Sequence, residues 1–372
     1  MLPLGRSVLL AGVLLCAGCA APVSRLPVLP KDAVAAETRK QQIAQLRKYY
    51  GEQHRVDGVA FRIRTANAQF CKDWVSARIG LHAATPRSLP RKYQSYTAEA
   101  LNLTWTRPTA ISVVEGSPAA QAGIASGDQI IALNGELIPV SGTAGWMDRW
   151  LRHNGVLPVR VDTRREGVDR TVTVTPVMGC AIPIQYVTDD VVNAYTTGDK
   201  IVIYSAIVAL ARTDDQLASV IGHELAHANL GHPDKTQWNT ILGQASGAAV
   251  DLGILVGGLS TGGAFMREFG KAGQLAYSVS FEREADYVGA YYAARAGYDV
   301  AAAAELWRAM GISHPAEIRL SATHPVTPVR VVQMQKVAVE IAEKKRRHMP
   351  LLPDLKFAGI RSEPPDAGGG QF

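Results

Sequence analysis

Ser219-Val220-Ile221-Gly222-His223-Glu224-Leu225-Ala226-His227 is the stretch that decides the fold of the second half of this chain. It contains the pattern H-E-x-x-H. On a helix, residues four apart lie on one face, so His223 and His227 can present two imidazole nitrogens to a single Zn²⁺ ion. Glu224 would lie beside that ion, within reach of a metal-bound water, which is the position that a general base needs.

The residues around this pattern predict a helix over about 213–231. Thr213-Asp214-Asp215-Gln216 is a capping box that brings acidic residues to the positive end of the helix dipole. Apolar residues then recur at helical spacing, and Gly231 followed by Pro233 ends the helix. The alternative is a pair of histidines on an ordinary amphipathic helix, because the motif alone is short.

Two histidines leave a catalytic zinc site one protein ligand short. A second helix, expected from about 280 to 296, carries Glu282 and Asp286 on the same face. The small residues of that face, which would allow close approach to the first helix, are Gly289 and Ala293. We therefore predict Glu282 as the third ligand, with Glu284 as the alternative. Asp286 is expected to orient a liganding histidine.

The N-terminal sequence predicts an export signal. An apolar run over 8–15 leads into Cys16-Ala17-Gly18-Cys19-Ala20 and is too short for a stable membrane span. Ala-Gly-Cys resembles a bacterial lipoprotein cleavage site, which would leave Cys19 as a lipid-carrying first residue. Ala20 after it resembles lipoproteins of the outer membrane. Ordinary signal cleavage, leaving a soluble periplasmic protein, is the alternative.

The composition is that of a globular protein, with 372 residues, 47% hydrophobic and 19% charged. The formal charge of +6 is spread out except for a basic run at 344–347, which we interpret as a solvated helix end, so no nucleic-acid partner is expected. Once a signal peptide of residues 1–18, which includes Cys16, is removed, two cysteines remain besides Cys19. In an exported chain Cys71 and Cys180 suggest a disulfide, with two buried free thiols as the alternative.

From about 93 to 178, short strands and turns replace the helical pattern. Within 111–135 predicted strands alternate with Gly-Asp and Asn-Gly turns. The sequence G-S-P-A, A-G-I, G-D-x-I-x-x-L-N-G resembles the PDZ domain, which binds a peptide by adding it as a strand beside one edge. We recognise no Gly-rich carboxylate loop upstream of Thr109. Peptide recognition and a spacer role therefore both stay open.

The rest of the chain is expected to surround these two parts. Residues 37–50 predict a short helix and 59–64 a strand. Ile201 to Ser205 is an apolar strand and our candidate for the sheet edge beside the motif helix. The Ala/Gly-rich stretch 240–273 is a poor membrane span. It is interpreted as a mobile helical hairpin over the cleft, with a plain buried hairpin as the alternative.

Five motifs in order resemble a known family. They are Asn193-Ala194-Tyr195, the H-E-L-A-H of 223–227, the E-R-E-A-D of 282–286, Ala296-Gly297-Tyr298 and Thr323-His324-Pro325. They look like the HtpX-type zinc metallopeptidases, which are related to the CAAX prenyl endopeptidases, over about residues 180–345. One departure is Val279, where many relatives carry arginine.

The resemblance implies one Zn²⁺ per chain, held by His223, His227 and Glu282, with Asp286 as the supporting acid. It also implies that His324 and Arg330 lie near the cleft, where they would gate the zinc or steady an oxyanion. From the residues alone, His324 would be a surface residue at a helix start. His232 and His314 are not expected to be ligands.

We therefore expect an α+β protein, with a mainly helical zinc metallopeptidase domain, a small sheet and an inserted PDZ-like domain rich in β-structure. The expected segments are a lipoprotein signal peptide 1–18, a tether 19–36, the N-terminal part of the catalytic unit 37–92, the PDZ-like domain 93–178, the metallopeptidase domain 179–348 and a disordered tail 349–372. The resemblance implies an endopeptidase of the bacterial cell envelope, anchored to the membrane by its lipid, that cleaves misfolded or stalled envelope proteins. The alternative is a PDZ-based binding protein or holdase with a latent or structural metal site.

Overall fold

The computed structural model describes residues 24, 26–72, 74–237, 241, 244, 248, 264–313 and 328–354. The chain divides into two compact units, 1–42 and 43–372. None of the helices among the described residues has the length and apolar character that a membrane crossing requires. The predictions for Cys19, His314, His324, the tail beyond 354 and most of the hairpin fall outside the described residues.

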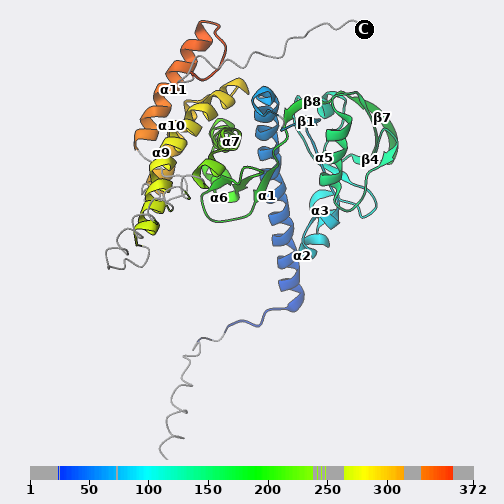
Figure 1. The fold of residues 1–372 in the computed structure, drawn as a ribbon. Helices are drawn as coiled ribbons and strands as arrows, with labels where there is room; N and C mark the ends of the chain where they lie inside the picture. The colour runs from blue at the N-terminus through cyan, green and yellow to red at the C-terminus, as the bar shows by residue number, and fades with distance from the viewer. Residues whose placement is uncertain are drawn as a thin grey trace, which may run out of the picture. The chain divides into compact units, whose positions relative to one another are not determined.

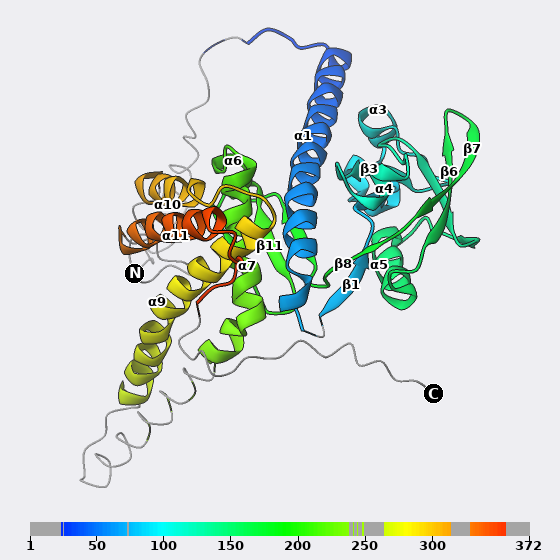
Figure 2. The same cartoon turned by 90° about the horizontal axis from the view of Figure 1, so that it is seen from above.

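One long helix, α1 (Lys31–Ala66), replaces the short helix and the strand that the sequence suggested (Figures 1 and 2). Its first turns also take up the last part of the expected tether. Val56, Val59, Ala60 and Ile63 are buried in the core at helical spacing. Apolar and polar residues alternate over 59–64 as they do in a strand. The segment is nevertheless helical, because the apolar residues of the whole of α1 recur at helical spacing and form one continuous buried face.

The inserted module is built on an antiparallel sheet of six strands, with β2, β3, β4, β6 and β7 in that order and β5 beside β4. The strands are β2 (Leu81–Ala84), β3 (Thr109–Val113), β4 (Gln129–Leu133), β5 (Glu136–Leu137), β6 (Val159–Arg165) and β7 (Val168–Val174). The helices around it are α2 (Arg91–Gln94), α3 (Thr97–Leu101), α4 (Pro118–Gln121) and α5 (Thr143–Asn154). The sheet reaches back to β2, so it begins before the expected boundary at 93.

The strands that enter and leave the module pair with each other. β1 (Val75–Arg78) runs antiparallel to β8 (Val177–Cys180), with Val75 opposite Cys180. A disulfide joins Cys71 to Cys180 directly beside this pair. The module is therefore closed at its base by a two-stranded ribbon and a covalent bond.

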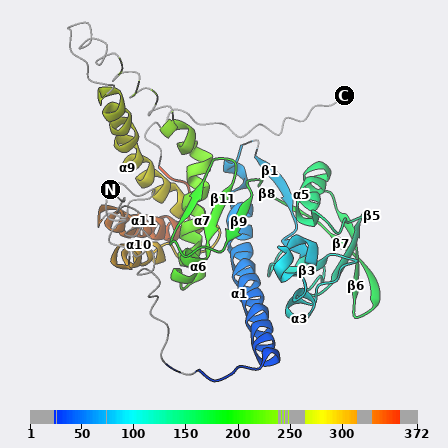
Figure 3. The same cartoon turned by 90° about the horizontal axis from the view of Figure 1, so that it is seen from below.

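The second half contains a small sheet in the order β10, β11, β9. The strands are β9 (Ile184–Val187), β10 (Ala194–Thr196) and β11 (Ile201–Tyr204), and Figure 3 shows β11 next to α7. β11 is the middle strand, so our expectation that it forms the edge is wrong. Ile201, Val202 and Ile203 are all buried, as is usual for a strand with neighbours on both sides.

Helices α7 (Asp214–Leu230) and α9 (Ala264–Arg295) cross closely. A Cβ atom built on Gly222 would lie 2.7 Å from the carbonyl oxygen of Gly289, and one on Gly289 would lie 2.8 Å from the amide nitrogen of His223. The expected close approach through small residues is thus present. The other helices of this half are α6 (Ser205–Leu210), α10 (Ala302–Ser313) and α11 (Pro328–Arg346).

Candidate metal centre

The start of α7 is fixed by side chains that cap it. The Thr213 hydroxyl accepts a hydrogen bond from the amide of Gln216 (3.2 Å). The Gln216 side chain reaches back to the amide of Arg212 (2.7 Å), one residue before the position that a capping box would use. The helix is then buried throughout 217–227, which carries its polar motif residues into the interior.

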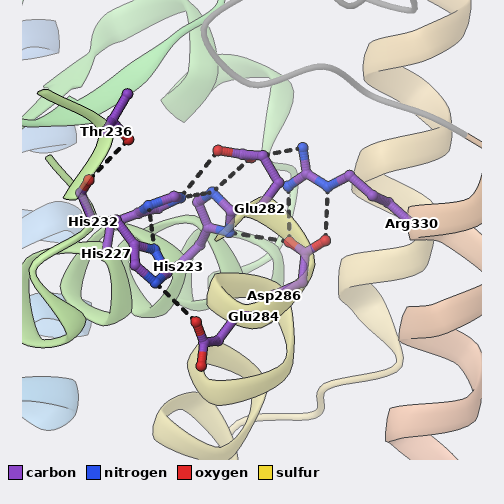
Figure 4. Close-up of polar contacts among 8 residues, drawn as sticks. All are labelled: His223, His227, His232, Thr236, Glu282, Glu284, Asp286 and Arg330. Carbon is purple, nitrogen blue, oxygen red and sulfur yellow. Dashed lines mark hydrogen bonds and ion pairs between the residues drawn. The ribbon is translucent and has the colours of Figure 1, made fainter. Parts of the chain in front are cut away.

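Three predicted ligands converge between α7 and α9. The Nε2 atoms of His223 and His227 lie 3.1 Å apart, and the Glu282 carboxylate lies 3.2 Å from Nε2 of His227 and 3.4 Å from Nε2 of His223. All three residues are buried, and one ligand atom from each lies within 4.8 Å of the others. They form a possible metal site, which Figure 4 shows with its supporting residues.

Asp286 and Arg330 support one side of this group. Oδ1 of Asp286 lies 3.0 Å from Nδ1 of His223, as expected of a carboxylate that orients a ligand. Arg330 donates to both oxygens of Asp286 (2.7 and 2.8 Å) and lies 3.0 Å from Glu282. Burial favours the neutral form of Asp286, but Arg330 and His223 outweigh burial and hold the pKa of its carboxyl below the ordinary value.

Arg330 lies beside the predicted metal ligands, at 3.0 Å from Glu282. Its guanidinium is buried and directed at two carboxylates, so the contacts seen here are those of a counter-ion within the site. A role for Arg330 in stabilising an oxyanion stays a prediction. The same holds for His324, which lies outside the described residues.

Two further residues, for which no supporting role was predicted, hold the other side. Nδ1 of His232 lies 2.9 Å from Nδ1 of His227, and Nε2 of His232 lies 3.1 Å from Glu284. Burial lowers the pKa of His232 to about 4. The sequence feature that indicates this position of His232 is Gly231, the residue after α7. In the structure Gly231 is left-handed (φ +65°) and turns the chain so that His232 points back toward the motif.

The charges and donor atoms of the site fit a divalent zinc ion. The buried acids are Glu224, Glu282 and Asp286, and the buried base among them is Arg330, so the formal sum is 1 − 3 = −2 when the histidines are neutral. An ion of charge +2 would balance this sum. Two imidazoles and one carboxylate are a known ligand set for catalytic zinc, with a further position left for water.

The chain matches two family models. Residues 181–338 match peptidase family M48 and residues 110–155 match the PDZ domain. The match to peptidase family M48 covers most of the predicted metallopeptidase domain, 179–348. Members of this family are zinc-dependent, so the zinc metallopeptidase and the α+β class with a PDZ domain are confirmed. The HtpX-type subdivision stays a prediction.

Two relatives are named mitochondrial metalloendopeptidase OMA1. The one from Schizosaccharomyces pombe is 27% identical over 170 residues, which is 44% of this chain and 48% of the relative. The one from Arabidopsis thaliana is 31% identical over 138 residues, or 36% of this chain and 26% of the relative. The chain thus spans less than half the length of either. Together with the family match, they support a metalloendopeptidase.

Solved structures give only a distant likeness. The HtrA3 PDZ domain bound to a phage-derived ligand is 21% identical, covers 28% of this chain and 90% of its own, and has a TM-score of 0.22. The HtrA-type protease AlgW with a decapeptide is 19% identical over 29% of this chain and 30% of its own, with a TM-score of 0.23. Scores this low bear no conclusion about the fold.

Proposed function

We propose that this protein is a zinc endopeptidase that cleaves misfolded or stalled proteins of a bacterial cell envelope. The observation that carries the proposal is the buried group of His223, His227 and Glu282 with Glu224 on the same helix. A bound zinc would be held by those three side chains and would lower the pKa of a water toward neutrality. Glu224 would take the proton from that water and return it to the leaving amine.

The edge strand β10 is the proposed platform for substrate. β11 covers one side of β10, and β10 also packs against α7, the helix that carries both histidine ligands. An extended polypeptide could add to the open side of β10 as a further strand. Its backbone would then run past the metal site, which fits an enzyme that accepts many sequences.

The PDZ domain is proposed to bind peptides through β2, the edge strand of its sheet. Gly80, with φ of +70°, directly precedes β2, upstream of Thr109, where the sequence alone showed no Gly-rich carboxylate loop. A cavity of about 460 Å³ lies beside this edge and α5, with Leu81 and Met147 among its apolar residues. Its charged residues include Arg64, Asp57 and an Arg78–Asp148 pair (3.1 Å). The apolar residues together with Arg64 suit a peptide end with an apolar side chain and a carboxylate.

The proposed location rests on the N-terminal sequence and on the disulfide. Cys19 and the signal lie outside the described residues, so the lipid anchor, the periplasm and the outer membrane remain part of the proposal. The bond between Cys71 and Cys180 supports an oxidising compartment, since structural disulfides are rare in the cytosol.

The experiment is a comparison of wild type with Glu224→Gln and Glu282→Ala on reduced, denatured casein, with zinc content measured for each protein. We expect cleavage by wild type only. Glu224→Gln should keep about one zinc per chain and Glu282→Ala should lose it. If wild type and Glu224→Gln both bind casein and neither cleaves it, the proposed enzymatic activity is wrong and a binding protein with a structural metal is favoured.

A further inference from the structure

We infer that His232 and Glu284 are positioning residues for the metal ligand His227, joined to it in one directed chain of hydrogen bonds. The inference rests on the proposed zinc site and adds two residues to it. The sequence alone does not predict it, because it indicates His232 only as a non-ligand and Glu284 only as the alternative metal ligand.

The direction of the chain follows from what a metal requires of His227. Its Nε2 atom faces the other ligands, so binding a cation there needs a free lone pair and places the proton on Nδ1. That Nδ1–H donates to Nδ1 of His232 (2.9 Å), which must then accept and carry its own proton on Nε2. The Nε2–H of His232 in turn donates to the Glu284 carboxylate (3.1 Å). Every donor has an acceptor, and each tautomer is fixed by the next.

Several contacts hold His232 in this orientation. Its ring stacks on Phe281 with centroids 4.5 Å apart and an angle of 17° between the planes. The residue is only 2% exposed, whereas the Glu284 side chain is 51% exposed. His232 therefore connects a buried ligand to a carboxylate that stays in water, which avoids burying another negative charge in a site that already holds three.

The two ligand histidines are thus supported in different ways. His223 is oriented directly by the buried Asp286, whose charge Arg330 neutralises. Nδ1 of His227 instead contacts His232, which leads on to the Glu284 carboxylate. Partners of this kind fix the ring and raise the basicity of a ligand, and their loss typically costs about 10–100-fold in metal affinity.

Two other roles for His232 agree less well with the contacts. A fourth metal ligand would have to face the Nε2 side of His227, but His232 meets the Nδ1 side, and the metal-binding group among the described residues holds only the three predicted ligands. A histidine that served only to pack on Phe281 would need no polar contact at its ring nitrogens, whereas both ring nitrogens of His232 have one.

The test measures zinc affinity of the full chain by competition with a chromophoric chelator at pH 7.5, so it does not depend on proteolysis. The variants are His232→Ala, His232→Asn and Glu284→Gln, and the matched control is Glu305→Gln at an exposed position of α10. We expect His232→Ala to bind zinc about 10–100-fold more weakly. His232→Asn should recover much of the loss, because its amide oxygen can accept from Nδ1 of His227. Glu284→Gln should show a smaller loss and Glu305→Gln none.

The outcomes separate this inference from the metal site itself. If wild type binds no zinc, the proposed metal centre fails and the chain of hydrogen bonds with it. If wild type binds zinc and both His232→Ala and Glu284→Gln bind equally well, the metal centre stands and the inference is wrong. If His232→Asn is as weak as His232→Ala, and both lower the Tm of the metal-free protein equally, then His232 only fills space and the inference is also wrong.

Discussion

The crossing of α7 and α9 predicts that Gly289→Ala will disturb both stability and zinc binding. An added Cβ would lie 2.8 Å from the His223 amide nitrogen and 2.9 Å from its Cα atom. These distances fall ~0.7 Å short of ordinary contact, and the obstacles are backbone atoms that cannot rotate away. The helices must separate, at a cost of about 1–3 kcal/mol, against a gain of about 1 kcal/mol from the better helix propensity of alanine.

Gly58→Ala on α1 is the matched control. It is also a helical glycine, but nothing lies within 4 Å of its added Cβ, so only the gain from helix propensity remains. Thermal unfolding of the metal-free proteins should place Gly289→Ala about 1–3 kcal/mol below this control. Its zinc affinity should also fall, because His223 moves away from Glu282. The reasoning is refuted if Gly289→Ala is as stable as Gly58→Ala and binds zinc like wild type.

Three other changes test the electrostatics and the cross-link. Arg330→Met removes the cation that pairs with two buried carboxylates. The free energy of unfolding of the metal-free protein in urea should therefore fall by about 3–5 kcal/mol, and bound zinc should reduce this difference from wild type. Unfolding curves equal to those of wild type would contradict this. Burial raises the pKa of Asp128, but the hydrogen bonds from Arg165 and a backbone amide outweigh it and lower that pKa below its ordinary value. Asp128→Asn should therefore destabilise the PDZ domain at pH 7, with the difference from wild type shrinking as the pH falls below about 4; a difference constant with pH would count against it. Replacing Cys71 and Cys180 by alanine opens a loop with a sequence separation of 109 and should lower the free energy of unfolding by about 4–5 kcal/mol. An unchanged midpoint of urea unfolding would show that the disulfide does not stabilise the fold.

The metal ligands could be predicted because their chemistry is local in the sequence. His223 and His227 are four apart on one helix, and Glu282 and Asp286 are four apart on another, so helical geometry alone puts each pair on one face. The small residue Gly289 then predicted that the two faces meet. The support of His227 was not predictable in this way, because His232 reaches it only through a turn whose φ the sequence does not state.

Strand neighbours were the weakest predictions, because they depend on residues far apart in the chain. The pattern of β11 is that of a buried strand, and a buried strand usually lies between two others, so its apolar run argued against an edge from the start. β2 has four residues and no turn signal that ties it to β3, more than twenty positions later. Its place in the PDZ sheet comes from pairing alone.

Residues 59–64, predicted as a strand, belong to the helix that contacts both the PDZ sheet and the motif helix α7. As part of α1, this segment continues a helix that contacts the PDZ sheet through His54 and Ser112 (2.8 Å) and the first turn of α7 through Arg55 and Asp214 (2.8 Å). Successive side chains on a helix diverge by about 100°, so the neighbours His54 and Arg55 can contact different elements from one helix. Because α1 is a continuous helix, this one segment contacts both the PDZ domain and the helix that carries the metal ligands.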